Sequence, residues 1–122
     1  LFWIQNKKTG SLINCCIIFA CILAQSSITE RESLVNYSEN LGLAFQITDD
    51  LLDLKGDEQK LGKPTRQDKS NKTPNFVTIL GEYQAKEKCK IFSEKAIDSL
   101  KIFGKNAKNL VLLAKYSIER EF

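Results

Sequence analysis

The chain has 122 residues, 43% of them hydrophobic and 27% charged, with a formal net charge of +3. This length is enough for one domain with its own core. It contains no histidine and no CxxC pair, which excludes a zinc site of Cys and His ligands and a Ser–His or Cys–His nucleophile. The 18 Lys and Arg residues are spread along the chain, which argues against a nucleic-acid partner.

The first predicted element is an apolar helix over residues 7–25. Its apolar core is too short for a membrane span, which needs about 20 residues. Apolar positions occur all round it, so we expect a buried helix in a cytoplasmic protein, with Cys15, Cys16 and Cys21 as reduced thiols. The chain has no methionine and starts with the apolar residues LFWI, which predicts that it is part of something longer.

A long second helix is predicted from Thr29 to about Leu54. Thr29 and Glu32 have the T-x-x-E spacing of a capping box, and Gly56 stands where helices commonly end. Residues 56–74 are polar and hold both prolines, so they are predicted to form a loop. The loop is longer than most connections, which indicates a functional segment.

Three further helical segments are predicted downstream. Residues 75–81 form a short apolar turn or helix, and residues 82–103 have apolar positions at spacings of three and four, the pattern of an amphipathic helix. Gly104 ends that helix, and a last helix covers residues 106–120. No segment alternates strictly enough to predict a strand, so the predicted fold class is all-α, with residues 1–122 forming one unit.

The stretch GLAFQITDDLLD at residues 42–53 places three aspartates on an otherwise apolar helix. No Lys or Arg lies between residues 32 and 54, so like charges one turn apart repel each other. A solvated helix face is one interpretation. The other is a wet cavity in which the carboxylates bind a divalent cation, and oxygen ligands without histidine or cysteine favour Mg²⁺ shared with phosphate. At about 100° per residue, the arc of the helix that carries the acids contains Gly42, Gln46, Asp49, Asp50 and Asp53.

Basic residues suited to phosphate flank the aspartates. Lys63 and Lys72 lie in the loop that follows them, and Lys8-Thr9-Gly10 opens the first helix, where free backbone N–H groups favour an anion. For each lysine alone, an ordinary solvated surface charge is the alternative interpretation.

These segments occur in a familiar order and spacing: Lys8-Thr9-Gly10, GLAFQITDDLLD, Gly56-Asp57 and LGKP at residues 61–64. The chain resembles the C-terminal part of the trans-isoprenyl diphosphate synthases, or polyprenyl synthetases, most closely those of the bacterial farnesyl diphosphate synthase (geranyltranstransferase) type. The resemblance implies an antiparallel helical bundle, the C-terminal portion of the isoprenoid synthase fold, and a homodimer in the intact enzyme. It implies Mg²⁺-dependent head-to-tail condensation of isopentenyl diphosphate with an allylic diphosphate, geranyl to farnesyl diphosphate.

The resemblance also implies a role for each matching residue. Asp49 is then a direct Mg²⁺ ligand, with Asp50 and Asp53 acting through metal-bound water or hydrogen bonds. Lys8 and Lys63 bind the allylic diphosphate. The oxygens of Thr9 and Gln46 stabilise the positive charge of the allylic carbocation.

The sequence departs from the family pattern in two places. Thr73 and Asn75 stand where the family usually has a lysine and a threonine, and Lys72, one residue early, either reaches the same diphosphate from a shifted backbone or the contact is lost. The first aspartate-rich motif and the arginine pair that follows it in the family are not in the chain. Three hypotheses remain open: part of a farnesyl diphosphate synthase completed by a longer chain or a separate subunit, a truncated non-catalytic fragment, or a helical interaction module.

Overall fold

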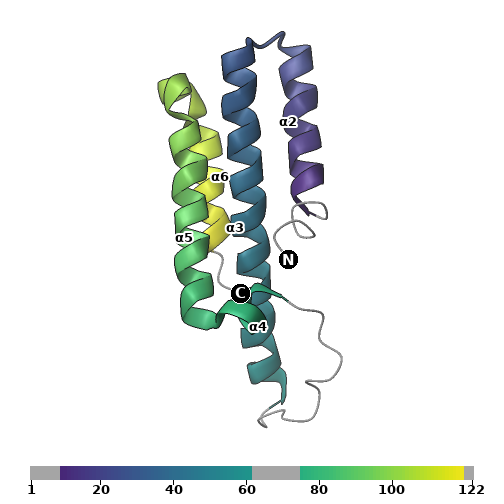
Figure 1. Ribbon diagram of the computed structural model, residues 1–122, viewed down its shortest axis with the longest axis vertical. Coiled ribbons are helices and arrows are strands. Elements are labelled where there is room, and N and C mark those ends of the chain that lie inside the picture. The colour runs from purple at the N-terminus through teal and green to yellow at the C-terminus, as the bar shows by residue number, and fades with distance from the viewer. Residues whose placement is uncertain (1–8, 62–74, 120–122) are drawn as a thin grey trace.

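Helix α3, Ile28–Leu61, is the central element of the protein (Figure 1). The computed structural model describes residues 9–61 and 75–119, without the side chains of residues 55–61. Neighbouring helices run in opposite directions, with α2 on one side of α3 and the α5–α6 pair on the other. No strand occurs within the described ranges, which confirms the predicted all-α antiparallel bundle. The other elements are α2 (Ser11–Leu23), α4 (Phe76–Leu80), α5 (Glu82–Ser99), the 3₁₀ helix η2 (Lys101–Ala107) and α6 (Lys108–Glu119).

The turn between α2 and α3 follows from local hydrogen bonding. Gln25 has a φ of 52°, and its N–H donates to the carbonyl of Ile22 at 3.2 Å while that of Ser26 donates to Cys21 at 3.0 Å. This is the Schellman arrangement, which satisfies the last carbonyls of a helix. The chain is thereby turned back so that α3 runs antiparallel to α2.

A capping box starts α3, at Ser27 and Glu30. The Ser27 N–H donates to the Glu30 carboxylate at 2.8 Å, and the Glu30 N–H donates to the Ser27 hydroxyl at 3.3 Å. The bond from the Ser27 backbone, followed by one from its hydroxyl, holds the pKa of Glu30 below its usual range. The predicted capping box at Thr29 and Glu32 is therefore wrong by two residues, because Ser27 and Glu30 have the same spacing and come directly after the turn.

Two helix ends also differ from their predicted positions. α3 continues through Gly56 to Leu61, because a single glycine inside a helix costs only about 1 kcal/mol. The helix predicted over residues 82–103 ends at Ser99, and η2 connects it to α6. Gly104 lies within that connection with a φ of 54°, so the glycine does make the turn, a few residues beyond the end of the α-helix.

The side of α3 that faces α5 and α6 forms the core. One cluster surrounds Tyr37 and Leu41, and a second surrounds Ala44 and Ile47 and continues to Phe76 of α4. The Tyr37 side chain is 1% exposed, and its hydroxyl donates to the carbonyl of Leu110 at 2.9 Å. Burial raises the pKa of Tyr37 to about 12, because the charged phenolate is poorly solvated there. This packing holds α3 and α4 in place at the candidate site.

Helix α2 is less buried than its sequence predicts. Among its residues only Cys21 is buried, whereas Cys15 and Cys16 are exposed. The expectation of a buried helix with three buried thiols is therefore wrong for two of them, because α2 packs against α3 on one side and no other described helix covers its opposite side. None of the described helices combines the length and apolarity needed to cross a membrane. The large apolar side chains that α2 exposes are Leu12, Phe19, Ile22 and Leu23.

Candidate functional site

Four residues of α3 form a line toward α2 and α4, at a spacing of four along the helix: Ser38, Gly42, Gln46 and Asp50. We call this line the polar stripe. Residues four apart lie on one face of a helix. The Ser38 hydroxyl lies within hydrogen-bond distance of two acceptors, the carbonyl of Val35 at 2.8 Å and the side-chain oxygen of Asn14 in α2 at 3.1 Å. The remaining members contact the beginning of α2 and the beginning of α4, so the stripe joins two segments that are far apart in sequence.

Gly42 allows the beginning of α2 to approach α3 closely. A Cβ atom on Gly42 would lie 2.9 Å from the Cα atom of Gly10, closer than such atoms pack. Gly10 is buried. Because both residues are glycines, the two backbones touch, and this contact places Thr9 beside Gln46.

A chain of three hydrogen bonds runs from Thr9 to α4, and we call it the relay. The Thr9 hydroxyl donates to Oε1 of Gln46 at 3.0 Å, and Nε2 of Gln46 donates to Oδ1 of Asp50 at 3.0 Å. Oδ2 of Asp50 accepts the backbone N–H of Phe76 at 2.8 Å. Thr9 and Gln46, which the sequence assigns to one site, are therefore in direct contact. The contact with Phe76 has no counterpart in the sequence prediction.

The three aspartates differ in their surroundings. Asp50 is 6% exposed, and both of its oxygens accept hydrogen bonds from within the protein. Asp49 is half-buried and Asp53 is exposed, and the two lie one turn apart on α3. Among the described residues no group of three or more His, Cys, Asp or Glu is close enough to hold a metal ion. Two carboxylates still fit Mg²⁺, which commonly takes one or two protein carboxylates and completes its shell with water and phosphate.

The beginning of α4 is fixed by Asn75. Its side chain accepts the N–H of Thr78 at 2.8 Å, and its own N–H donates to the Thr78 hydroxyl at 3.0 Å. Asn and Thr are both good N-cap residues, so Asn75 can start the helix in place of the threonine that the resemblance leads us to expect. α4 is thereby positioned with the Phe76 N–H directed at Asp50.

The lysines predicted to bind diphosphate, Lys8, Lys63 and Lys72, lie outside the described residues. Their roles stay predictions. Lys8 directly precedes Thr9 in sequence, and Lys63 and Lys72 belong to the connection between α3 and α4.

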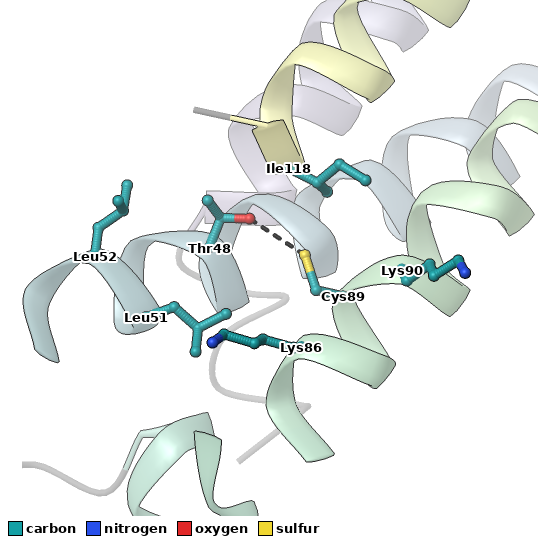
Figure 2. A pocket seen from close by; sticks show the side chains of 7 residues that line it. All are labelled: Thr48, Leu51, Leu52, Lys86, Cys89, Lys90 and Ile118. Atoms are coloured by element: carbon teal, nitrogen blue, oxygen red, sulfur yellow. Dashed lines mark hydrogen bonds between the residues drawn. The ribbon is translucent and has the colours of Figure 1, made fainter. Parts of the chain in front are cut away.

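The side of α3 remote from the polar stripe borders a cavity of about 300 Å³ between α3, α5 and α6 (Figure 2). The Thr48 hydroxyl and the Cys89 thiol point toward one another there, 3.2 Å apart. Apolar side chains form most of the walls, and the charged residues among the described lining are two lysines. Its lining residues are Thr48, Leu51, Leu52, Lys86, Cys89, Lys90 and Ile118.

Comparison with known proteins places this geometry in a family. Residues 2–110 match the family model described as polyprenyl synthetase. The chain is 36% identical over 93 residues to the farnesyl diphosphate synthase of Bacillus subtilis, covering 76% of this chain and 31% of that protein. It is 35% identical over 119 residues to the short chain isoprenyl diphosphate synthase of Methanocaldococcus jannaschii, covering 93% of this chain and 35% of that protein.

A solved structure agrees with these relatives. The FPP/GFPP synthase of Zymomonas mobilis superimposes with a TM-score of 0.80 at 29% identity, covering 95% of this chain and 36% of that chain. The chain thus spans 31 to 36% of the length of these three proteins. Its helices match the all-α isoprenoid synthase fold along almost their whole course. The chain therefore belongs to the polyprenyl synthetase family.

Proposed function

We propose that the chain contributes one side of the active site of a prenyltransferase, which condenses isopentenyl diphosphate head-to-tail with an allylic diphosphate, geranyl to farnesyl diphosphate, in isoprenoid biosynthesis. The observation that carries the proposal is the juxtaposition of Thr9 and Gln46, joined by a hydrogen bond of 3.0 Å, on the same side of α3 as the aspartates. The relative from Bacillus subtilis is itself a farnesyl diphosphate synthase.

The aspartates provide the metal-binding part of the proposal. Asp49 and Asp53 offer carboxylates one helical turn apart, at half-buried and exposed positions. When bound, Mg²⁺ would neutralise the charge of the diphosphate as it leaves the allylic carbon. Lys8, Lys63 and Lys72 would add point charges for the diphosphate oxygens.

The side-chain oxygens of Thr9 and Gln46 would stabilise positive charge on the substrate. The Thr9 hydroxyl uses its proton to bond Gln46, so both oxygens keep lone pairs that would meet a cation bound beside them. Oxygen dipoles that are already oriented stabilise developing positive charge without reorganising during the reaction. The allylic carbocation formed on loss of diphosphate is such a charge. Isopentenyl diphosphate would then attack this cation through its double bond and lose a proton.

The proposal extends to the surroundings of the enzyme. It implies that the two diphosphates are the small-molecule partners, that the active protein is a homodimer, and that it works in the cytoplasm. The exposed apolar residues of α2, among them Phe19 and Leu23 at 61% and 85% exposure, are consistent with further protein packing against this helix.

The test combines binding with turnover, on the protein as produced from its own gene. Thermal unfolding is measured with inorganic diphosphate, with and without Mg²⁺. Ligand at about 100 times its dissociation constant should stabilise the fold by about 2.7 kcal/mol. Labelled isopentenyl diphosphate and geranyl diphosphate should then yield labelled farnesyl diphosphate. Binding without turnover would favour the non-catalytic alternative, and no thermal shift would count against the site itself.

A further inference from the structure

Asp50 is the buried one of the three aspartates, whereas Asp49 is half-buried and Asp53 is exposed. The side chain is 6% exposed. Oδ2 accepts the Phe76 N–H at 2.8 Å and Oδ1 accepts Nε2 of Gln46 at 3.0 Å. Both distances are within the usual range for N–H···O hydrogen bonds. Both oxygens of the side chain are therefore hydrogen-bonded within the protein. One donor, on Phe76, is 26 residues away in sequence, and the other, on Gln46, is four residues away.

The hydrogen bonds of the relay can point in only one direction, because its Asp50 end is a carboxylate. A backbone N–H can only donate, and a carboxylate can only accept. Gln46 must therefore present its NH₂ group to Asp50, which turns its carbonyl oxygen toward Thr9. Thr9 must in turn donate its only hydroxyl proton to that oxygen. The order of donors thus runs from Thr9 through Gln46 to Asp50, with Phe76 donating from the other end.

We infer that Asp50 is a positioning residue, which fixes the Gln46 side-chain amide so that the oxygens of Gln46 and Thr9, rather than the Gln46 NH₂ group, face the position where positive charge develops. The inference deepens the proposed function and rests on it for the identity of that charge. It separates Asp50 from its neighbours, because Asp50 acts through Gln46 and not through the metal. It also gives α4 a part in the site, since the Phe76 N–H holds the carboxylate in place.

The substitution Asp50→Asn tests this with almost no change in volume. The Phe76 N–H still requires an acceptor, so it should keep the oxygen of the new amide. The NH₂ group of the new amide then faces Gln46, and two NH₂ groups cannot bond each other. Gln46 should rotate by half a turn and present its own NH₂ group to Thr9, which reverses the direction of the relay.

Nuclear magnetic resonance of the full chain reads this reversal directly. In the wild type we expect scalar couplings across the hydrogen bonds from Phe76 N and Gln46 Nε2 to the carboxyl carbon of Asp50. In Asp50→Asn we expect new proton contacts between the Gln46 NH₂ group and the Thr9 side chain. The inference would be overturned if the wild type lacked these couplings, or if Gln46 kept its wild-type orientation in the variant. The wild-type couplings decide the matter even if the variant does not fold.

Metal dependence separates positioning from ligation. With Asp50→Asn we expect kcat to be at least about tenfold lower, the equivalent of one hydrogen bond misdirected in the transition state. The Mg²⁺ concentration that gives half of the maximal thermal shift in the presence of diphosphate should change less than about twofold. A tenfold higher Mg²⁺ requirement would make Asp50 a metal ligand and overturn the inference. If the wild type neither binds diphosphate nor turns over, the proposed function fails, and the resonance measurements still decide the orientation of Gln46.

A matched control is available on α5. Asp98→Asn removes the same charge by the same change, at a carboxylate that is 63% exposed and paired with Lys101. It should leave the Gln46 orientation, kcat and the Mg²⁺ requirement unchanged. An effect of Asp98→Asn equal to that of Asp50→Asn would mean that net charge, and not the relay, is responsible.

Discussion

The two sides of α3 are held in different ways. Toward α5 and α6, Tyr37, Leu41, Ala44 and Ile47 are between 0 and 4% exposed and contact apolar side chains. Toward α2 and α4, the polar stripe makes directed contacts, in which polar atoms meet specific donors or acceptors. Apolar packing tolerates exchange of one side chain for another of similar volume, whereas a hydrogen-bonded chain does not tolerate a donor in place of an acceptor. We therefore expect the first side to determine stability and the second side to determine activity.

Substitution of two adjacent residues of α3, one from each side, should have the largest effect. Asp49→Ala should lower kcat by at least about a hundredfold, because loss of a charged group that acts in the transition state costs several kcal/mol. Thr48→Val, one residue earlier and facing Cys89, should change kcat less than about threefold. Steady-state kinetics of prenyl transfer measures both. A near-wild-type rate for Asp49→Ala would remove the metal role from this side of α3.

The side of α3 that packs against α5 and α6 should make the stability of the protein depend on pH at high pH. Burial raises the pKa of Tyr37 to about 12, above the ordinary value of about 10. A raised pKa in the folded state means that stability is intact below pH 10 and is lost as the pH rises toward 12. At about 1.4 kcal/mol per pKa unit, the loss should be about 2 kcal/mol by pH 12. Urea unfolding from pH 9 to 12 measures it.

Tyr37→Phe is the control for that experiment. It removes the titrating group and its bond to Leu110, so its free energy of unfolding should start about 1 kcal/mol lower and then fall less steeply with pH. Equal slopes for the two proteins would mean that Tyr37 is not the group responsible.

Disturbing the close approach of α2 to α3 should have a smaller effect, on both stability and the geometry of the site. Gly42→Ala adds a Cβ atom 2.9 Å from the Cα of Gly10, and the strain should cost about 1–3 kcal/mol, offset by up to about 1 kcal/mol of helix propensity. Displacement of α2 should also lengthen the bond from Thr9 to Gln46. Thermal unfolding of Gly42→Ala should therefore shift to a lower temperature. An unchanged or higher midpoint would show that α2 and α3 can move apart at no cost in stability.

The sequence predicts the fold better than it predicts the contacts within the site. Apolar periodicity and the lack of alternating segments are enough for an all-α bundle, because they depend on residues close in sequence. The contact of Asp50 with the Phe76 N–H joins residues 26 apart, and no local pattern encodes it. A signal for the polar stripe was present in the spacing of four between Ser38, Gly42, Gln46 and Asp50. The end of α3 was misplaced because glycine disfavours a helix without forbidding it.

The smallest expected effect concerns Thr48, on the packed side. Its hydroxyl donates to the carbonyl of Ala44 at 3.0 Å, a bond within the helix, and Cys89 also contacts that carbonyl, at 3.4 Å. Thr48→Val removes the hydroxyl, but the carbonyl retains the thiol and its helical partner, and the new methyl group is buried. We expect a loss of only about 0.5–1 kcal/mol by chemical unfolding. Thr29→Val, the same change at an exposed position of α3, corrects for helix propensity. A loss above about 2 kcal/mol relative to Thr29→Val would show that the packed side also depends on directed hydrogen bonds, and the two sides of α3 would then differ in degree only.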